Sequence, residues 1–259
     1  MTSPLPPQRP LEPQPCALVV GASSGIGAAL VRELVRRGYR VAAVARRQTE
    51  LDQLAATLNA NQPTPRVLAY AHDVTAFDEI PTLFQRIIHE LGGLDMVIYN
   101  AGVMPAVGLD EYDFAKDKAQ IEVNLLGAMA WLNETAARFQ RAGNGRIVGI
   151  SSVAGDRGRR GNPAYNTSKA ALTTYLEALR NRLTQHGVNV TTIKPGFVQT
   201  DMLANAAKTF WVISPESAAQ QIVTAAEKNR QTVYIPWRWG LVMLIIRHIP
   251  SFIFRRMGI

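Results

Sequence analysis

The sequence predicts a single α/β domain in which a doubly wound parallel sheet lies between two layers of helices. Short apolar runs alternate with longer segments of helical spacing from residue 16 to residue 235. Strands that alternate with helices of this length form parallel crossover units. The first apolar run passes through a glycine-rich turn, GASSGIG, into a helical pattern, which is typical of a phosphate-binding unit. We therefore expect a three-layer α/β/α fold.

The expected elements follow from these runs and from helix-start signals. Strands are expected over residues 17–20, 40–45, 66–71, 94–99, 145–151, 188–193 and 232–235. Helices are expected over residues 26–34, 49–59, 76–91 and 117–141, and beginning at residues 163 and 215. The last two starts rest on cap pairs, Asn162-Pro163 and Ser214-Pro215, because asparagine or serine at the cap and proline at the first helical position favour a helix N-terminus.

The composition is that of an ordinary globular protein. The 259 residues are 47% hydrophobic and 19% charged. Cys16 is the only cysteine, so no intrachain disulfide can form, and the four histidines are scattered without the spacing of metal ligands. We expect no structural metal and a reducing, cytoplasmic location. Residues 1–15 hold six prolines and no apolar run long enough for an export signal, which predicts a disordered leader.

The glycine-rich turn suits a dinucleotide. Gly21 allows a tight turn, Gly25 lets the backbone approach a pyrophosphate, and Gly27 lets the helix pack closely on the sheet. The anion would then lie at a helix N-terminus, where free backbone N–H groups and the dipole favour negative charge.

The second strand ends at a pair of arginines, Arg46 and Arg47. A carboxylate near this position would bind the ribose 2′-hydroxyl of NAD, whereas an arginine suits the 2′-phosphate of NADP. No Asp or Glu occurs between Arg36 and Glu50. The sequence therefore predicts NADP(H), with Arg46 as the first contact and Arg47 as the second. The alternative is that both arginines only cap a loop.

Asn124 lies near the middle of the long helical pattern over 117–141. Asparagine is a mediocre helix former, so its presence there needs an explanation. Either it faces water, or it disturbs the helix and binds a water that feeds a site.

The stretch from Ser152 to Lys169 carries the chemistry. The fifth strand delivers Ser152 to the carboxyl end of the sheet, where ligands of open α/β sheets bind, while Ser151 points to the opposite face. Tyr165 and Lys169 are four residues apart and would emerge from one helix face. A neighbouring cation lowers the pKa of a phenol, and Ser152 could donate a hydrogen bond to the same substrate oxygen. The alternative is a surface pair on a solvated helix.

Two later segments stand apart from the regular pattern. Residues 198–213 match no regular element, and because a loop this long is usually functional, we expect it to overlie a nicotinamide. Residues 236–259 form an apolar, basic tail whose uncharged run, 240–246, is far below the ~20 residues that span a bilayer. Its two tryptophans and flanking arginines suit a segment lying in a membrane interface, and burial against a second subunit is the alternative.

The charge is concentrated in the same tail. Of the net charge of +8, six positive charges and no negative one lie from Lys228 to the end. Because these charges accompany apolar residues and do not form a separate basic helix, we expect no nucleic-acid binding. Contact with lipid would fit a lipophilic carbonyl substrate, such as a long-chain keto compound. Arg157, Arg159 and Arg160 would then attract an anionic head group or simply remain solvated.

Over residues 17–235 the sequence resembles the short-chain dehydrogenase/reductase superfamily. The motifs that carry the resemblance are GASSGIG, Asp73-Val74, YNAG at residues 99–102, Asn124 in VNLLG, Ser152, YNTSK and Pro195-Gly196. Two positions depart from the family pattern. Val20 replaces a threonine that often precedes the first glycine, and Tyr99 replaces the first asparagine of NNAG; both concern structural support more than chemistry.

The resemblance implies a Rossmann-like catalytic domain over residues 16–235 with a tetrad of Asn124, Ser152, Tyr165 and Lys169. It also implies Asp73 at the adenine, Lys169 on the nicotinamide ribose and Thr200 near the carboxamide. The expected cofactor contacts are Gly21, Ser23, Ser24, Gly25, Ile26, Gly27, Arg46, Arg47, Asp73, Val74, Asn100, Ala101, Gly102, Tyr165, Lys169, Pro195, Gly196, Val198 and Thr200.

The implied reaction is reversible hydride transfer between C4 of the nicotinamide and a carbonyl or carbinol carbon. Tyr165 would exchange the proton, Ser152 would hold the oxygen, Lys169 would orient the ribose and lower the tyrosine pKa, and Asn124 would anchor a water. We expect reduction of a ketone or aldehyde by a homodimer or homotetramer. The alternative is a sensor or scaffold that binds dinucleotide without turnover, although in such proteins the tetrad is usually broken.

Overall fold

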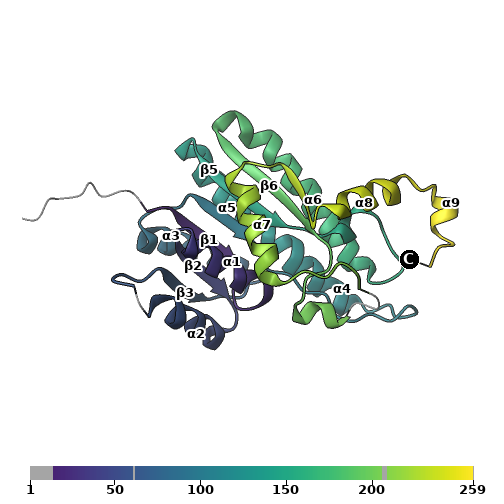
Figure 1. Cartoon of the computed structure of the whole chain (residues 1–259), viewed down its shortest axis with the longest axis horizontal. Coiled ribbons are helices and arrows are strands. Elements are labelled where there is room, and N and C mark those ends of the chain that lie inside the picture. Colours follow the sequence, from purple (N-terminus) through teal and green to yellow (C-terminus); the bar gives the residue numbers. More distant parts are fainter. Residues whose placement is uncertain (1–13, 61, 206–208, 259) are drawn as a thin grey trace, which may run out of the picture.

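The protein is a seven-stranded, entirely parallel sheet. Helices cover both faces of the sheet (Figure 1). The computed structural model describes residues 14–60, 62–205 and 209–258. The strand order is β3-β2-β1-β4-β5-β6-β7. The strands are β1 Cys16–Val20, β2 Arg40–Ala45, β3 Val67–Ala71, β4 Met96–Tyr99, β5 Gly145–Ile150, β6 Val188–Pro195 and β7 Thr232–Ile235. The predicted Rossmann-like, single-domain fold is confirmed.

Two apolar cores separate the sheet from its helical layers. The longer helices are α1 Gly25–Arg36, α2 Gln48–Asn59, α3 Ile80–Leu91, α4 Phe114–Ile121, α5 Gly127–Ala142, α6 Pro163–Leu183, α7 Pro215–Glu227 and α8 Arg238–His248, followed by the short α9 Ser251–Phe254. Alternate residues of the strands face opposite layers. Thus Ala17 and Val19 pack with α1, α2 and α7, whereas Leu18 and Val20 pack with α3, α5 and α6.

The strand order reverses between β1 and β4, and this reversal positions the site. Both strands run the same way and pair directly, Val20 opposite Tyr99. The connection from β1 therefore leads away to one side of the sheet and the connection from β4 to the other. A crevice at the carboxyl ends of such strands is the usual ligand site of an open α/β sheet.

Two of the predicted elements were wrong in detail. The helix predicted over 117–141 is broken into α4 and α5 by a π-helical turn, Glu122–Leu126, which has Asn124 at its centre. The loop predicted over 198–213 contains a 3₁₀ helix, Asp201–Asn205, and its ends are joined by an isolated bridge between Val198 and Ile213.

The C-terminal segment packs on its own domain, which neither expectation for it included. Trp239 and Met243 of α8 are 2% and 0% exposed, and they form a small apolar core with Val153. Trp239 lies against Gly196, where an added Cβ would be 1.8 Å from the indole Nε1. The predicted leader over 1–15 lies mostly outside the described residues, of which Gln14 and Pro15 lead into β1. No helix in the described ranges combines the length and apolar character needed to cross a bilayer.

Candidate active site

A cavity of about 350 Å³ opens at the carboxyl ends of the strands beside the switch in strand order. Most of the cofactor contacts predicted from the sequence line it: Gly21, Ser23, Ser24, Gly25, Ile26, Arg46, Arg47, Asp73, Val74, Asn100, Ala101, Gly102 and Thr200. Its wall also includes residues that the sequence did not single out: Ala45, His72, Val103, Val123, Asp201 and Met202. The other predicted contacts, Gly27, Tyr165, Lys169, Pro195, Gly196 and Val198, are not part of this wall.

The glycine-rich turn leaves no room for side chains. Gly21 has φ +88°, and a Cβ there would be 2.5 Å from the amide nitrogen of Ala101. A Cβ on Gly27 would be 1.9 Å from the carbonyl oxygen of Gly21. Asn100 closes the turn, because its side-chain Nδ2 donates to that same carbonyl at 2.8 Å. The turn, the start of α1 and the end of β4 are therefore closely packed, and the Asn100 side chain bonds the turn to the end of β4.

Two arginines stand at the mouth of the cavity. Arg47 donates from Nη2 to the hydroxyls of Ser24 at 2.6 Å and Ser23 at 2.9 Å. Arg46 lies with Nη1 3.7 Å from Oδ2 of Asp73. Hydrogen bonds from Thr75 are the main reason that the pKa of Asp73 is lowered, against the opposing effect of burial. Both arginines are exposed on the side of the turn where β2 ends.

Asn124 is fully buried, so the reading in which it faces water was wrong. Its Oδ1 accepts from the Val103 amide at 2.7 Å, and its Nδ2 donates to the Val103 carbonyl at 3.0 Å and to the Ser168 hydroxyl at 3.1 Å. The π-helical turn confirms that the helix is disturbed here. Asn124 thereby joins the loop after β4 to α6.

Tyr99, the departure from NNAG, supports this turn. Its side chain is fully buried and its hydroxyl donates to the Val123 carbonyl at 2.6 Å. A Cβ at Gly127 would be 2.6 Å from the same hydroxyl, so glycine makes room for the longer side chain. The hydroxyl satisfies a carbonyl in the turn that carries Asn124, which is a structural role.

Tyr165, Lys169 and Ser152 are buried together near the start of α6, and the reading of a solvated surface pair was wrong. Their exposures are 9%, 4% and 9%. Helix α6 begins at Pro163, and Asn162 accepts from the Tyr165 amide at 3.2 Å, as the cap pair predicts. An added Cβ on Gly102 would be 3.4 Å from Nζ of Lys169, so the loop after β4 lies beside that amine.

The electrostatics of this group differ from the expectation. Burial raises the pKa of Tyr165, and a hydrogen bond with Ser152 lowers it in part. Lys169 donates from Nζ to the Ile150 carbonyl at 2.9 Å and lies 5.8 Å from the centroid of the Tyr165 ring. Burial lowers the pKa of Lys169 to about 8. The lowering of the tyrosine pKa by Lys169, predicted from their spacing, is therefore not seen, because the amine is turned to a backbone oxygen.

The tyrosine hydroxyl adjoins the cavity through Met202. The Met202 sulfur lies 4.0 Å from the Tyr165 hydroxyl, and Met202 also lines the cavity. Thr200 of the same loop approaches the phosphate turn, since a Cβ on Gly25 would be 2.8 Å from its Cγ2. Residues 200–202 of this loop thus line the cavity between the glycine-rich turn and the tyrosine.

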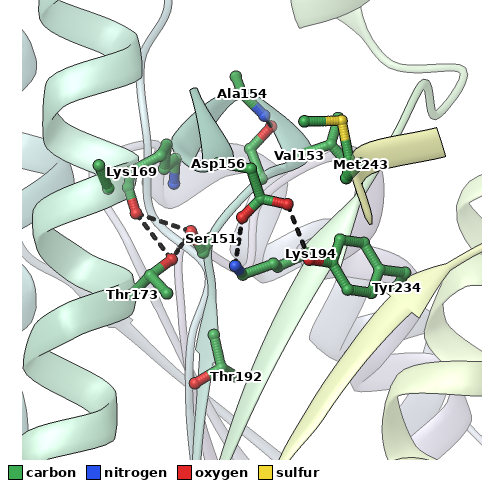
Figure 2. Close-up of polar contacts among 12 residues, drawn as sticks. Ser151, Val153, Ala154, Asp156, Lys169, Thr173, Thr192, Lys194, Tyr234 and Met243 are labelled. Carbon is green, nitrogen blue, oxygen red and sulfur yellow. Dashed lines mark hydrogen bonds and ion pairs between the residues drawn. The ribbon is translucent and has the colours of Figure 1, made fainter. Parts of the chain in front are cut away.

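A buried ion pair holds the loop that follows Ser152 (Figure 2). The Lys194 ammonium contacts Oδ1 of Asp156, and the Tyr234 hydroxyl donates to Oδ2 at 2.7 Å. The side chains of Lys194 and Asp156 are only 6% and 2% exposed. The three residues come from β6, the loop after β5 and β7, so this cluster joins three strand ends. No local motif indicated it, because its members are 38 and 78 residues apart.

Ser151 makes a second connection behind Ser152 (Figure 2). Its hydroxyl donates to the Lys169 carbonyl at 2.9 Å and bonds the Thr173 hydroxyl at 2.8 Å. It is therefore occupied in holding α6 against the end of β5. This geometry agrees with the choice of Ser152, which lowers the pKa of Tyr165, as the serine of the site.

Sequence comparisons find relatives along nearly the whole chain. A family profile described as short chain dehydrogenase matches residues 15–210. An uncharacterised oxidoreductase of Mycobacterium tuberculosis is 32% identical over 241 residues, covering 92% of this chain and 95% of that protein. The ketoacyl reductase HetN of Nostoc sp. is 32% identical over 224 residues, covering 84% of this chain and 77% of that protein.

Solved structures share the fold at lower identity. ElxO with NADP bound superposes with a TM-score of 0.76 at 20% identity, covering 86% of this chain and 98% of that one. The crystal structure of gox2181 gives a TM-score of 0.78 at 21% identity, covering 87% and 96%. At these identities the likeness supports the fold alone.

Proposed function

The chain belongs to the short-chain dehydrogenase/reductase family, and we propose that it is an NADP(H)-dependent carbonyl reductase. Members of this family are oxidoreductases that use a nicotinamide dinucleotide. The observation that carries the proposal is the burial of Ser152, Tyr165 and Lys169 together near a cavity that is lined by the glycine-rich turn and the residues after β4. Without that cavity, no cofactor could bind near the three side chains.

The residues present fit a dinucleotide. Helix α1 begins at Gly25, which lines the cavity, so the free backbone N–H groups at this helix end would meet a pyrophosphate. The wall continues past Asp73 toward Gly102 at the end of β4. The bound cofactor would supply or accept the hydride.

The chain's own residues would handle the proton and the oxygen. Tyr165, whose pKa is raised by burial, keeps its proton at neutral pH and can give it to a carbonyl oxygen that gains charge. Ser152, buried beside Tyr165, would donate to the same oxygen. Lys169, with a pKa of about 8, still carries most of its charge at neutral pH and would hold a ribose hydroxyl. Asn124 would anchor the water that returns the proton.

The preference for NADP(H) rests on Arg46 and Arg47. Both are exposed at the end of β2, and Arg47 already bonds Ser23 and Ser24 of the phosphate turn. A 2′-phosphate there would meet two guanidinium groups, and no carboxylate lies between residues 36 and 50 to bind a 2′-hydroxyl. We expect Arg47→Gln and Arg46→Gln each to lower kcat/KM with NADPH at least tenfold while leaving NADH nearly unchanged. Equal losses with both cofactors would contradict this assignment.

The proposed substrate is a lipophilic ketone or aldehyde. Phe197, Phe210 and Trp239 form an aromatic cluster, in which Trp239 lies against Gly196. An apolar carbonyl compound would match this cluster. HetN, a relative of comparable length, is named for reduction of a ketoacyl group, which is a substrate of this kind. We further expect a homodimer or homotetramer in the cytoplasm, which light scattering and cell fractionation would measure.

The direct test replaces the proposed acid. Tyr165→Phe should bind NADPH normally, measured by cofactor fluorescence, and lose nearly all NADPH oxidation across a panel of ketones, quinones and aldehydes. Tyr175→Phe, on the same helix with its hydroxyl on Asn133, is the matched control and should keep full activity. Substantial turnover by Tyr165→Phe would overturn the acid assignment. NADPH binding without turnover by the unaltered protein would favour the sensor or scaffold.

A further inference from the structure

Exposed apolar side chains gather at one end of the molecule. Ten of the fourteen large apolar residues that the described chain exposes lie in segments 210–212 and 237–257. They are Phe210, Trp211, Val212, Trp237, Leu241, Leu244, Ile245, Phe252, Ile253 and Met257, which we call the C-terminal patch. In Figure 1 the two helices of this region, α8 and α9, project beyond the sheet. Arg238 over the Trp211 ring at 5.2 Å joins the two segments.

Helix α8 has two apolar faces, and only one is used by the domain. Trp239 and Met243, one turn apart, are buried against Val153. Leu241, Leu244 and Ile245 fall on the opposite side of the helix and are 58%, 50% and 68% exposed. A helix that is apolar all round normally has partners on both faces. The outer face therefore lacks a partner within the described chain.

Arg157 holds this region in place without covering the outer face. Its Nη1 donates to the carbonyls of Ile246, Arg247 and Ile249, at 2.9, 3.0 and 2.6 Å. Its guanidinium also lies 4.2 Å from the centroid of the Phe254 ring. One arginine thus caps the end of α8 and fixes α9. The sequence had suggested instead that Arg157 binds a head group or remains solvated. Because Arg157 holds α8 and α9, the residues of the patch on these helices have fixed positions.

The charges around the patch have one sign. From Lys228 to the end the sequence has six basic residues and no acidic one. Arg238, Arg247, Arg255 and Arg256 are all exposed, and no described carboxylate lies within 4.0 Å of them. A two-fold contact between copies through this patch would bring like charges together, which is unfavourable. A negatively charged surface would complement them.

We propose that the C-terminal patch docks the protein on an anionic lipid surface. Trp211, Trp237 and the leucines of α8 would enter the boundary between head groups and acyl chains, where amphipathic aromatic rings are favoured. The four exposed arginines would bind lipid phosphates beside them. This proposal does not depend on the reaction, because docking uses none of the residues assigned to the cofactor or to proton transfer.

The test is flotation of the full chain with vesicles. We expect it to rise with vesicles of phosphatidylcholine mixed with phosphatidylglycerol, to bind pure phosphatidylcholine at least tenfold more weakly, and to detach as salt is raised. The triple variant Leu241→Gln, Leu244→Gln, Ile245→Gln and the triple variant Arg247→Gln, Arg255→Gln, Arg256→Gln should each lose at least tenfold in binding. The double variant Leu109→Gln, Leu126→Gln, at exposed sites outside the patch, is the matched control and should bind like the unaltered protein.

Point variants are preferable to truncation, because removal of residues 237–259 would also remove the buried Trp239 and Met243. An unchanged thermal midpoint of each variant separates loss of docking from loss of fold. Failure of the unaltered protein to float, equal binding to uncharged vesicles, or full binding by both triple variants would overturn the proposal. So would a shift from dimer to monomer in the leucine variant by light scattering, since the patch would then be a contact between copies.

Discussion

The cofactor side and the substrate side of this site are built by different means. On the cofactor side, an added Cβ on Gly21 or Gly27 would stand within 3 Å of backbone atoms, and Asn100 donates to the Gly21 carbonyl at 2.8 Å. These residues come from short motifs at strand ends. On the substrate side, the loop after Ser152 is held by the buried pair of Asp156 and Lys194. The glycine-rich turn on the cofactor side has no space for an added atom. The loop on the substrate side depends on the pairing of two buried charges. We therefore expect substitutions on the cofactor side to weaken NADPH binding and substitutions on the substrate side to lower stability and kcat.

The largest loss of stability is expected from Lys194→Met. It leaves the Asp156 carboxylate buried with only the Tyr234 hydroxyl as a partner, and breaking one half of a buried pair costs about 3–5 kcal/mol. Because the cofactor side is untouched, we expect NADPH affinity to stay within a few fold while kcat falls, as the Ser152 loop loses its support. Chemical denaturation and cofactor fluorescence measure the two effects.

Two controls sharpen this expectation. Lys116→Met breaks an exposed pair with Glu111 and should change stability little, because exposed ion pairs contribute weakly. The double variant Asp156→Asn, Lys194→Met removes the orphaned charge and should regain part of the loss, which a double-mutant cycle would quantify. If Lys194→Met were no worse than Lys116→Met, the ion pair would have no role in holding the loop.

In contrast to Lys194→Met, Gly27→Ala should mainly weaken NADPH binding. Its Cβ would stand 1.9 Å from the Gly21 carbonyl, so α1 must shift away from the turn, and overpacking of this kind costs about 1–3 kcal/mol. The phosphate turn moves with the helix, and we expect NADPH binding to weaken by more than a hundredfold. Gly93→Ala is the matched control, because nothing lies within 4 Å of its Cβ. Retained NADPH affinity in Gly27→Ala would show that the close packing is not required.

The same contrast explains how much the sequence could predict. Neighbouring residues determine the turn at Gly21, the start of α6 at Pro163 and the order of strands and helices. The sequence therefore predicted these features. Contacts such as Asp156 with Lys194, or Arg157 with the end of α8, join residues far apart and have no local pattern. The pairing of an ordinary lysine with an ordinary aspartate is determined only when strands β5, β6 and β7 are brought together.

Asn124 shows a further limit, on local structure itself. Its neighbours have a regular helical pattern, and that pattern predicted one helix over 117–141. The π-helical turn is stabilised by partners outside the helix: Val103 and Ser168 bond the Asn124 side chain, and Tyr99 bonds the Val123 carbonyl. Tertiary contacts thus overrode propensity at the residue that the motif had marked as functional.

Tyr99→Phe tests the π-helical turn, which lies between the cofactor side and the substrate side of the site. It has the smallest expected effect on stability and kcat. The Val123 carbonyl would lose its bond from the phenol, and an unsatisfied buried carbonyl costs about 1–2 kcal/mol. The ring itself stays packed, so NADPH affinity should be unchanged, while kcat falls a few fold because Asn124 is held less firmly. Tyr112→Phe, 95% exposed, should alter neither quantity. A Tyr99→Phe protein with full stability and full kcat would mean that the π-helical turn is held by Asn124 alone, and that the departure from NNAG carries no structural consequence.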